Sequence, residues 1–275
     1  MTKFYGRWHN MNRMRLVSAY KDYGNRDMWD FNSPVKCVCD EQIYANKREG
    51  KQVMLLIEPR SIQPNVYDYA LQVAKDYEYV FTHDSQLLAV LPNAKPILWG
   101  GVWCSSENPE KTKLISMICS DKELCELHKE RKRIARKYKD KIDVFGTIDG
   151  GNYCEPIDTL EPYMYSVVIE NYIDDTWFTE KLLNCFATKT VPIYYGARDI
   201  FLYFDTGGMI VCKSIDEMEQ KIERILKDPE YATKNYYGYK MLGILRNYEL
   251  SKQYEKFDEW LYKTYEKEIG GLFES

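Results

Sequence analysis

The stretch that decides the fold runs Tyr165-Ser-Val-Val-Ile-Glu170-Asn171, continues with Phe178-Thr-Glu-Lys181 and ends in Val191-Pro-Ile-Tyr-Tyr-Gly196. Its hydrophobic period changes from that of a strand to that of a helix and back to that of a strand. The polar residues stand where the period changes. In open α/β sheets, ligands bind outside the carboxyl ends of the strands. The stretch therefore predicts an α/β sheet with a ligand site beside Glu170 and Asn171.

The helix inside this stretch has a clear start. Thr179 is a favourable N-cap residue, and Lys181 falls in the first turn. One apolar face follows, formed by Leu182, Leu183, Phe186 and Ala187. A helix N-terminus with a lysine beside it attracts anions, so the pattern predicts a phosphate site.

The length and composition limit the classes of protein to which this chain can belong. The 275 residues suit two compact domains, and a hydrophobic content of 45% is enough to build cores. The net charge of −4 does not suggest a nucleic-acid or anionic-membrane partner. The basic run over residues 129–141 offers a nucleic-acid alternative, but it lacks interleaved aromatic side chains. We therefore expect no nucleic-acid partner.

Eight cysteines and three histidines are spread along the chain. Only Cys37 and Cys39 are close together, no second pair stands at zinc spacing, and Asp174-Asp175 lacks a third ligand. We expect reduced thiols and no metal. No apolar run approaches the ~18 residues of a membrane-spanning helix, and no signal-peptide core follows Met1. These features favour a cytoplasmic protein without a transmembrane segment, or a trimmed piece of a longer one; peripheral membrane contact stays open.

Strand and helix patterns alternate on both sides of a polar segment at residues 101–112, which we place as a linker. Before it, the predicted elements are strands at 53–57 and 79–81, helices at 67–74 (with Tyr67, Ala70, Leu71 and Ala74 on the apolar face) and 85–90, and an extended piece at 96–99. After it come a strand at 114–119, a helix from a Ser120 cap to about Asp140, a strand at 142–145 and a later helix opened by the capping box Ser214–Glu217. This alternation predicts parallel sheets.

The domains are accordingly placed at residues 1–108 and 109–245, with a helical tail over 246–275. In the tail, apolar residues recur at helical spacing, at Leu250, Tyr254, Phe257 and Leu261. Residues 1–50 have weak periodicity, and no element is assigned there.

The decisive stretch also resembles the donor-binding signature of the α1,3/1,4-fucosyltransferases, glycosyltransferase family 10. The shared features are the Glu-Asn pair, the Phe-Thr-Glu-Lys run and Val-Pro-x-x-x-Gly, and the likeness extends over about residues 50–240. The resemblance implies a GT-B fold, with an N-terminal acceptor-binding and a C-terminal donor-binding Rossmann-like domain facing a cleft. It also implies transfer of L-fucose from GDP-fucose to a glycan hydroxyl, O3 of N-acetylglucosamine or glucose, with inversion and without a metal.

In a metal-free transferase, side-chain cations must neutralise the departing diphosphate. The resemblance assigns Lys181 to the phosphates and places Arg131 at the family's phosphate-binding arginine, with Arg133 as the alternative. The planar fork of arginine suits phosphate oxygens. Most other basic side chains of this predicted helix are expected to be solvated.

The other donor-side assignments also follow the resemblance. Glu170 and Asn171 are expected near the nucleotide and ribose, and Glu180 near the fucose, beside the cap residue Thr179. Trp177 stands where relatives often carry tyrosine, so an aromatic ring against the donor is expected without a phenolic hydroxyl. For Glu180 the alternative is a first-turn carboxylate that the helix dipole stabilises by only ~0.3–1 kcal/mol.

The general base is expected from the acceptor half. Glu58 follows the predicted strand at 53–57 and matches the family's catalytic glutamate in the segment before Pro59. A carboxylate at a strand end can instead cap a neighbouring helix. As a base, Glu58 should be partly buried, because burial raises the pKa of a carboxyl toward neutrality.

Two alternatives keep the fold and change the function. The first is another nucleotide-sugar donor, because the signature indicates phosphate and nucleotide more plainly than sugar. The second is a non-catalytic module that binds a carbohydrate or nucleotide. In the favoured reading, the partners are a nucleotide-sugar donor and an oligosaccharide acceptor.

Overall fold

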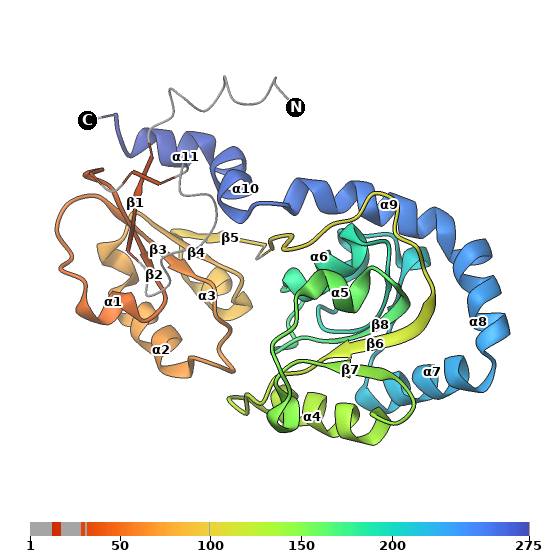
Figure 1. Ribbon diagram of the computed structural model, residues 1–275. Coiled ribbons are helices and arrows are strands. Elements are labelled where there is room, and N and C mark those ends of the chain that lie inside the picture. The colour runs from red at the N-terminus through yellow and green to blue at the C-terminus, as the bar shows by residue number, and fades with distance from the viewer. Residues whose placement is uncertain (1–12, 18–28, 31, 99, 275) are drawn as a thin grey trace. The chain divides into compact units, whose positions relative to one another are not determined.

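The computed structural model describes residues 13–17, 29–30, 32–98 and 100–274 (Figure 1). The chain forms two compact units, one of residues 1–97 with 256–275 and the other of residues 98–255. Each unit carries a five-stranded parallel sheet with helices around it. The prediction of two Rossmann-like α/β units is confirmed.

The first sheet has the strand order β1-β2-β3-β4-β5, which is also the order along the chain. The strands are β1 Arg15–Val17, β2 Lys36–Cys39, β3 Gln52–Leu56, β4 Tyr79–Thr82 and β5 Ala94–Pro96. The helices of this unit are α1 Gln42–Ala45, α2 Pro64–Val73, α3 Ser85–Val90, α10 Phe257–Thr264 and α11 Glu266–Gly271. Because successive crossovers step in the same direction, right-handed connections place α1, α2 and α3 on one face (Figure 1).

The strand β3 is buried along its whole length, so both faces of the first sheet need cover. Met54 and Leu56 pack into the cluster that includes the buried face of α2. Leu55 points to the opposite face and lies beside Phe81 in the strand register. There the Phe81 ring packs on Tyr265, which follows α10, with centroids 5.0 Å apart. The C-terminal helices thus complete the core of the first unit (Figure 1).

This arrangement differs from the single helical tail expected over residues 246–275. Helix α9 (Met241–Ser251) belongs to the second unit, and the backbone is extended at Lys256 before α10 begins. Phe257 and Leu261 are buried in the first unit. The helical spacing across the tail therefore joins two separate elements, because α9 packs on α6 in the second unit whereas α10 belongs to the first unit.

The second sheet has the order β10-β9-β8-β6-β7. Its strands are β6 Lys113–Ile118, β7 Asp143–Phe145, β8 Tyr163–Ile169, β9 Val191–Tyr195 and β10 Ile210–Val211. Besides α9, its helices are α4 Glu126–Tyr138, α5 Pro156–Leu160, α6 Glu180–Ala187, α7 Ile215–Lys227 and α8 Pro229–Asn235, with a π-helix at Tyr236–Lys240.

The direction of winding reverses in this second sheet. The chain steps from β6 to β7 on one side and then returns to β8 on the other side of β6. Right-handed connections consequently place α4 and α6 on opposite faces. The carboxyl ends of the strands at such a reversal are where ligands bind in open α/β sheets.

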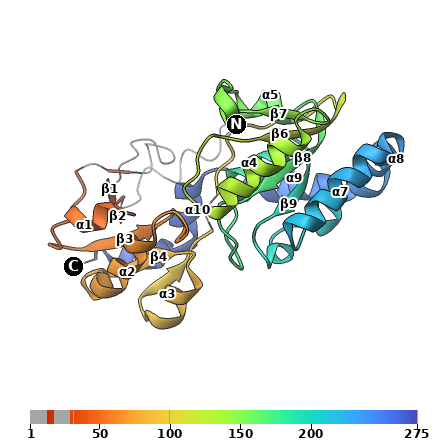
Figure 2. The same cartoon turned by 90° about the horizontal axis from the view of Figure 1, so that it is seen from below.

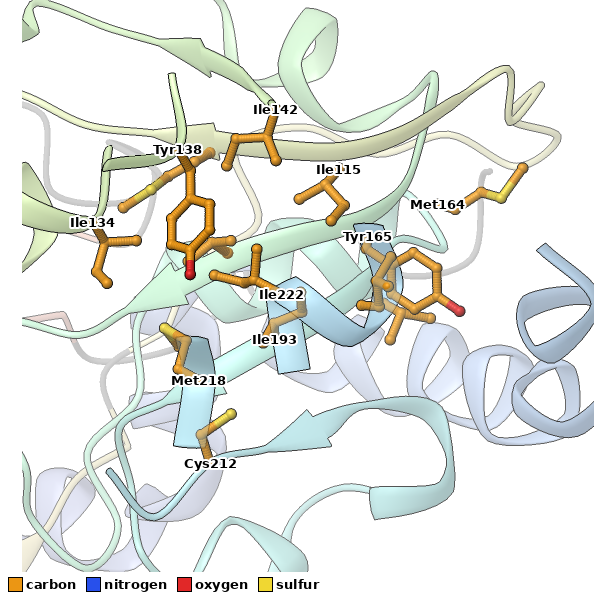
Figure 3. Close-up of a cluster of buried hydrophobic side chains, with 14 of the residues drawn as sticks. Ile115, Ile134, Tyr138, Ile142, Met164, Tyr165, Ile193, Cys212, Met218 and Ile222 are labelled. Atoms are coloured by element: carbon orange, nitrogen blue, oxygen red, sulfur yellow. The ribbon is translucent and has the colours of Figure 1, made fainter. Parts of the chain in front are cut away.

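A cluster of buried side chains joins the second sheet to α4 and α7 (Figure 3). Ile134 of α4 and Met218 of α7 are fully buried in it, together with Ile193 of β9. The two helices lie side by side (Figure 2) and are linked by Arg133, which donates to Glu219 at 2.7 Å. The buried face of α7 is formed by Met218, Ile222 and Ile225.

Two boundaries of the second unit differ from the expectations. The helix expected from Ser120 begins at Glu126, with Cys125 at its N-cap. The polar segment 101–112, expected to be a linker, lies inside the second unit. Lys111 in this segment is buried and donates to two main-chain carbonyls and a threonine hydroxyl, which explains why a polar stretch belongs to a packed unit.

Smaller differences occur in the first unit. Leu71 was expected on the apolar face of α2 but is 51% exposed, because the sheet covers only the stripe through Tyr67 and Ala70. Residues 1–50 contain β1, β2 and α1, which the periodicity had not assigned. The extended piece expected at 96–99 overlaps β5, and residue 99 lies outside the described residues.

No disulfide joins the eight cysteines, all of which are described. Across the described ranges, no helix is long and apolar enough to cross a membrane.

We expect Leu261→Ala to destabilise the first unit by about 3 kcal/mol, because it leaves a cavity where α10 covers the sheet. Urea unfolding measures this change. Lys263→Ala, on the exposed side of the same helix, is the matched control and should cost less than about 0.5 kcal/mol. Equal stabilities of the two variants would contradict a core role for α10.

Candidate functional site

Arg131 and Asn171 meet at the strand reversal of the second sheet. Asn171 follows the carboxyl end of β8, and α4, which connects β6 to β7, carries Arg131. Arg131 Nε donates to the carbonyl of Ile169 at 3.1 Å. Its Nη2 donates to the same carbonyl and, at 2.8 Å, to Asn171 Oδ1. The fold thus joins two candidates that lie far apart in the sequence.

The guanidinium group of Arg131 has N–H donors left for a ligand. Arg131 is only 7% exposed, and burial lowers its pKa while nearby Glu170 opposes the shift. Within the described part of the chain, no hydrogen bond uses its Nη1. The alternative candidate, Arg133, instead pairs with Glu130 and Glu219 on the exposed side of α4. Of the two arginines, the structure places Arg131 at the strand reversal.

Glu170 is fully buried and faces the start of α6. Its Oε1 accepts from the main-chain N–H of Thr179 at 3.0 Å, and its Oε2 accepts from the Thr179 hydroxyl at 2.8 Å. Burial raises the pKa of Glu170, and Lys181, whose Nζ lies 3.8 Å from Oε2, opposes this shift. The carboxylate therefore holds the residue that caps α6 and is enclosed by protein.

The first turn of α6 carries the remaining donor-side candidates. Thr179 is the N-cap, as predicted, and its hydroxyl accepts from the main-chain N–H of Lys181. Lys181 Nζ lies 2.9 Å from Glu180 Oε1 and 3.1 Å from the Thr179 hydroxyl. The lysine side chain is 28% exposed. A helix N-terminus and an accessible ammonium group are thus combined within one turn, which suits an anion.

Two further residues of the stretch pack around this turn. Trp177 is buried, and its ring contacts Tyr172 edge-on with centroids 6.5 Å apart. A Cβ at Gly196 would lie 2.3 Å from the Tyr194 hydroxyl oxygen and 2.7 Å from Glu170 Cγ. Glycine is therefore required at this position for Glu170 to reach the start of α6.

Two residues of this site, Cys125 and His128, were not predicted from the sequence. His128 Nε2 lies 3.0 Å from Asn171 Oδ1, and Cys125 Sγ lies 3.3 Å from the Asn171 carbonyl oxygen. Both stand on α4 or at its N-cap, and together with Arg131 they are spaced three residues apart, so they share one helix face. This three-residue spacing was the signal in the sequence that could have identified Cys125 and His128.

In the first unit, Glu58 lies just after β3, at the carboxyl edge of the first sheet. It is half-buried. Its main-chain N–H donates to Asp40 Oδ1 at 3.3 Å, and its carbonyl accepts from the Tyr67 hydroxyl at 2.6 Å. The backbone of Glu58 is thus fixed by two side chains from neighbouring elements.

Asp40, which was not predicted from the sequence, directly follows β2, has a positive φ of 45° and is 2% exposed. Its Oδ1 also accepts from the main-chain N–H of Ile57 at 2.8 Å. Burial raises the pKa of Asp40 to about 7, and the charge of Glu58 contributes in the same direction, while the hydrogen bonds oppose it. A second pair at this edge joins Arg60 to both carboxylate oxygens of Asp84, at 2.9 and 3.0 Å.

The described ranges hold no group of three or more His, Cys, Asp or Glu side chains that could bind a metal ion. Asp175 of the adjacent acidic pair instead accepts from Arg198 at 2.7 Å.

The family model described as glycosyltransferase family 10 (fucosyltransferase) C-term matches residues 108–260, more than half of the chain. The chain belongs to glycosyltransferase family 10. The match contains the whole donor-side cluster from Arg131 to Lys181 and leaves out Glu58 and Asp40.

The proteins and solved structures that are similar to this chain have low sequence identity to it. An alpha-(1,4)-fucosyltransferase of Arabidopsis thaliana is 27% identical over 92 residues, which are 32% of this chain and 23% of the plant protein. The chain thus matches less than a quarter of that relative's length. The solved structure of an alpha1,3-fucosyltransferase with GDP has a TM-score of 0.51 and 13% identity, covering 82% of this chain and 80% of that one. TarM has a TM-score of 0.55 and 12% identity, covering 88% and 55%. The two solved structures show a shared fold.

In this family 10 chain, we expect Asp40→Asn to remove a pH-dependent loss of stability. Because the folded state raises the pKa of Asp40 from 3.8 to about 7, the unfolded chain releases this proton first. The stability tied to protonated Asp40 is therefore complete below about pH 4 and lost as the pH rises through about 7. Asparagine keeps an acceptor oxygen and has no proton to release.

Urea unfolding of both proteins across this pH range measures the effect. The advantage of Asp40→Asn over the parent should grow between about pH 4 and pH 7 and level off above. Carboxyls that do not interact with Asp40 titrate equally in both proteins and cancel in the difference. A difference that does not change with pH would contradict the raised pKa.

We expect Gly196→Ala to destabilise the second unit by about 1–3 kcal/mol, because the added Cβ displaces Tyr194 or Glu170. Thermal unfolding monitored by circular dichroism measures it. Gly238→Ala, where an added Cβ meets no atom within 4 Å, is the control in the same unit. An unchanged midpoint for Gly196→Ala would refute the close approach at the start of α6.

Proposed function

We propose that the chain transfers L-fucose from GDP-fucose to a hydroxyl of a glycan acceptor. One observation carries the proposal: in a chain of family 10, Arg131 and the first turn of α6 with Lys181 stand at the strand ends of the second sheet. Two cations and a helix N-terminus match the charge of a nucleoside diphosphate. The same cluster supports binding of GDP more directly than it supports the choice of sugar.

Each donor-side residue has its own task in binding GDP-fucose. Arg131 Nη1 and the Lys181 ammonium group bind diphosphate oxygens, and they stabilise the negative charge that develops on the departing GDP. Glu170 acts on the donor only through Thr179, because the carboxylate is fully buried and occupied by that residue. Glu180 and Asn171 orient the donor. Trp177 packs behind the turn.

The transfer itself is a direct displacement. Glu58 takes the proton of the acceptor hydroxyl as its oxygen forms a bond to the anomeric carbon of fucose, and the bond from that carbon to the diphosphate oxygen breaks. The electron pair of the broken bond leaves on GDP. One displacement inverts the configuration, and the cations Arg131 and Lys181 fill the role that a metal has in other transferases. The resemblance to the family supports O3 of N-acetylglucosamine or glucose as the acceptor position.

We expect GDP-fucose to be consumed in the presence of a small array of acceptors, with the same rate in the presence of EDTA. Glu58→Gln should lower kcat at least about 100-fold, because a general base contributes a factor of this order. Release of GDP and the mass of the product measure the reaction. UDP-sugars serve as the competing donors.

Arg131→Ala should raise KM for GDP-fucose at least about tenfold through the loss of a charged contact. Arg136→Ala is the matched control on the same helix, since that arginine is exposed and pairs with Asp149. Loss of activity with EDTA would contradict the role of the cations. Turnover of a UDP-sugar alone would replace the proposed donor, and an unchanged rate for Glu58→Gln would remove the proposed base.

A further inference from the structure

Helix α8 follows directly after α7 (Figure 1), and residues of both helices line a cavity of about 330 Å³ together with the edge strand β10. This volume is in the range of small-molecule sites. Tyr165 of β8 also lines the cavity, six residues before Asn171. Six residues of extended chain span about 20 Å. The cavity is therefore separate from the donor-side cluster.

Three cationic side chains line this cavity, Lys221, Arg224 and Lys240. No Asp or Glu is among the described residues that line it. Lys221 lies 3.5 Å from Glu217 on the same helix. Within the described ranges, Arg224 and Lys240 have no carboxylate at salt-bridge distance; Arg224 lies over an aromatic ring and Lys240 binds main-chain carbonyls. The cavity thus carries an excess of positive charge.

The ammonium group of Lys240 is fixed by the main chain. Its Nζ donates to the carbonyls of Gly207 and Met209, at 3.2 and 2.7 Å. An ammonium group has three N–H donors, so one remains. Burial lowers the pKa of Lys240, and the charge of Asp205 opposes this shift. An anion in the cavity would accept from the remaining donor and offset the cost of burying the charge.

The π-helix at Tyr236–Lys240 explains how Lys240 reaches the cavity. In an α-helix, side chains five residues apart point about 140° away from each other. A π-helix closes its turn from residue i to residue i+5, which brings such a pair to one side. Asn235 and Lys240 are five residues apart, and both line the cavity. Single π-turns of this kind are frequent at functional sites.

We propose that this cavity binds a small organic phosphate. The phosphate group lies among Lys221, Arg224 and Lys240, and the apolar part of the ligand lies against Met209 and Ile225, which also line the cavity. A phosphate monoester carries about two negative charges near pH 7, which suits three cations of which one is shared with a carboxylate. The inference does not depend on the proposed function, because it uses none of the donor-side residues.

A titration with phenyl phosphate, followed by ¹H–¹⁵N NMR of the chain, tests the site. The main-chain signals of Ile210, Val211 and Asn235, which line the cavity, should shift together and saturate. Inorganic phosphate lacks the apolar part and benzyl alcohol lacks the charge, so each should bind at least about tenfold more weakly than phenyl phosphate.

Arg224→Ala should weaken the binding of phenyl phosphate at least about fivefold through the loss of a charged contact. Lys227→Ala is the matched control, because Lys227 is an exposed cation of α7 that does not line the cavity, and its affinity should stay within about twofold of the parent. Arg224 is itself exposed, so the unfolding temperature of Arg224→Ala should equal that of the parent. Arg131→Ala should bind phenyl phosphate like the parent.

Parental affinity in Arg224→Ala would overturn the inference, as would shifts that gather at Glu180 and Lys181 in place of β10. Equal binding of inorganic phosphate would contradict the contribution of the apolar wall. A failure of phenyl phosphate to bind leaves the proposed transfer of fucose untouched. Absence of GDP-fucose turnover, in the same way, does not alter the result of this titration.

Discussion

The donor side of this protein depends on one topological constraint, the reversal of strand order between β6 and β8. Because the helices on either side of the reversal leave toward opposite faces, the carboxyl end of β8 is bordered by α4 and α6 rather than covered by one of them. Two buried charges are placed there, and each is compensated locally. Arg131 is matched by the carbonyl of Ile169, and Glu170 by the cap residue Thr179. Buried charges are tolerated only with such partners.

The polar residues at the carboxyl ends of the strands are arranged differently in the two sheets. The first sheet runs in chain order and has no reversal among its described strands. Its polar residues are instead bound to one another: Asp40 holds the backbone of Ile57 and Glu58, and Arg60 is joined to Asp84. A proposed base at this edge has a fixed backbone and a second carboxyl as its neighbour, whereas the second sheet keeps cationic donors for a ligand.

Local patterns predicted much of the structure. The cap at Thr179 and the apolar face of α6 are decided within a few residues, and the strand β8 is a continuous buried run, so periodicity finds them. Long-range contacts explain the failures. The contacts of Cys125 and His128 with Asn171 become visible only when β8 brings Asn171 to α4. The single helical tail expected over residues 246–275 is divided between the two units, because helical spacing does not reveal to which unit a helix belongs.

The division of the chain has a consequence for biosynthesis. The second unit is continuous in sequence, whereas the first unit takes α10 and α11 from the end of the chain. Domains fold as units while the chain is being made, from the N-terminus onward. The sheet that is translated first therefore lacks one of its covers until α10 and α11, which follow the whole second unit, have been made.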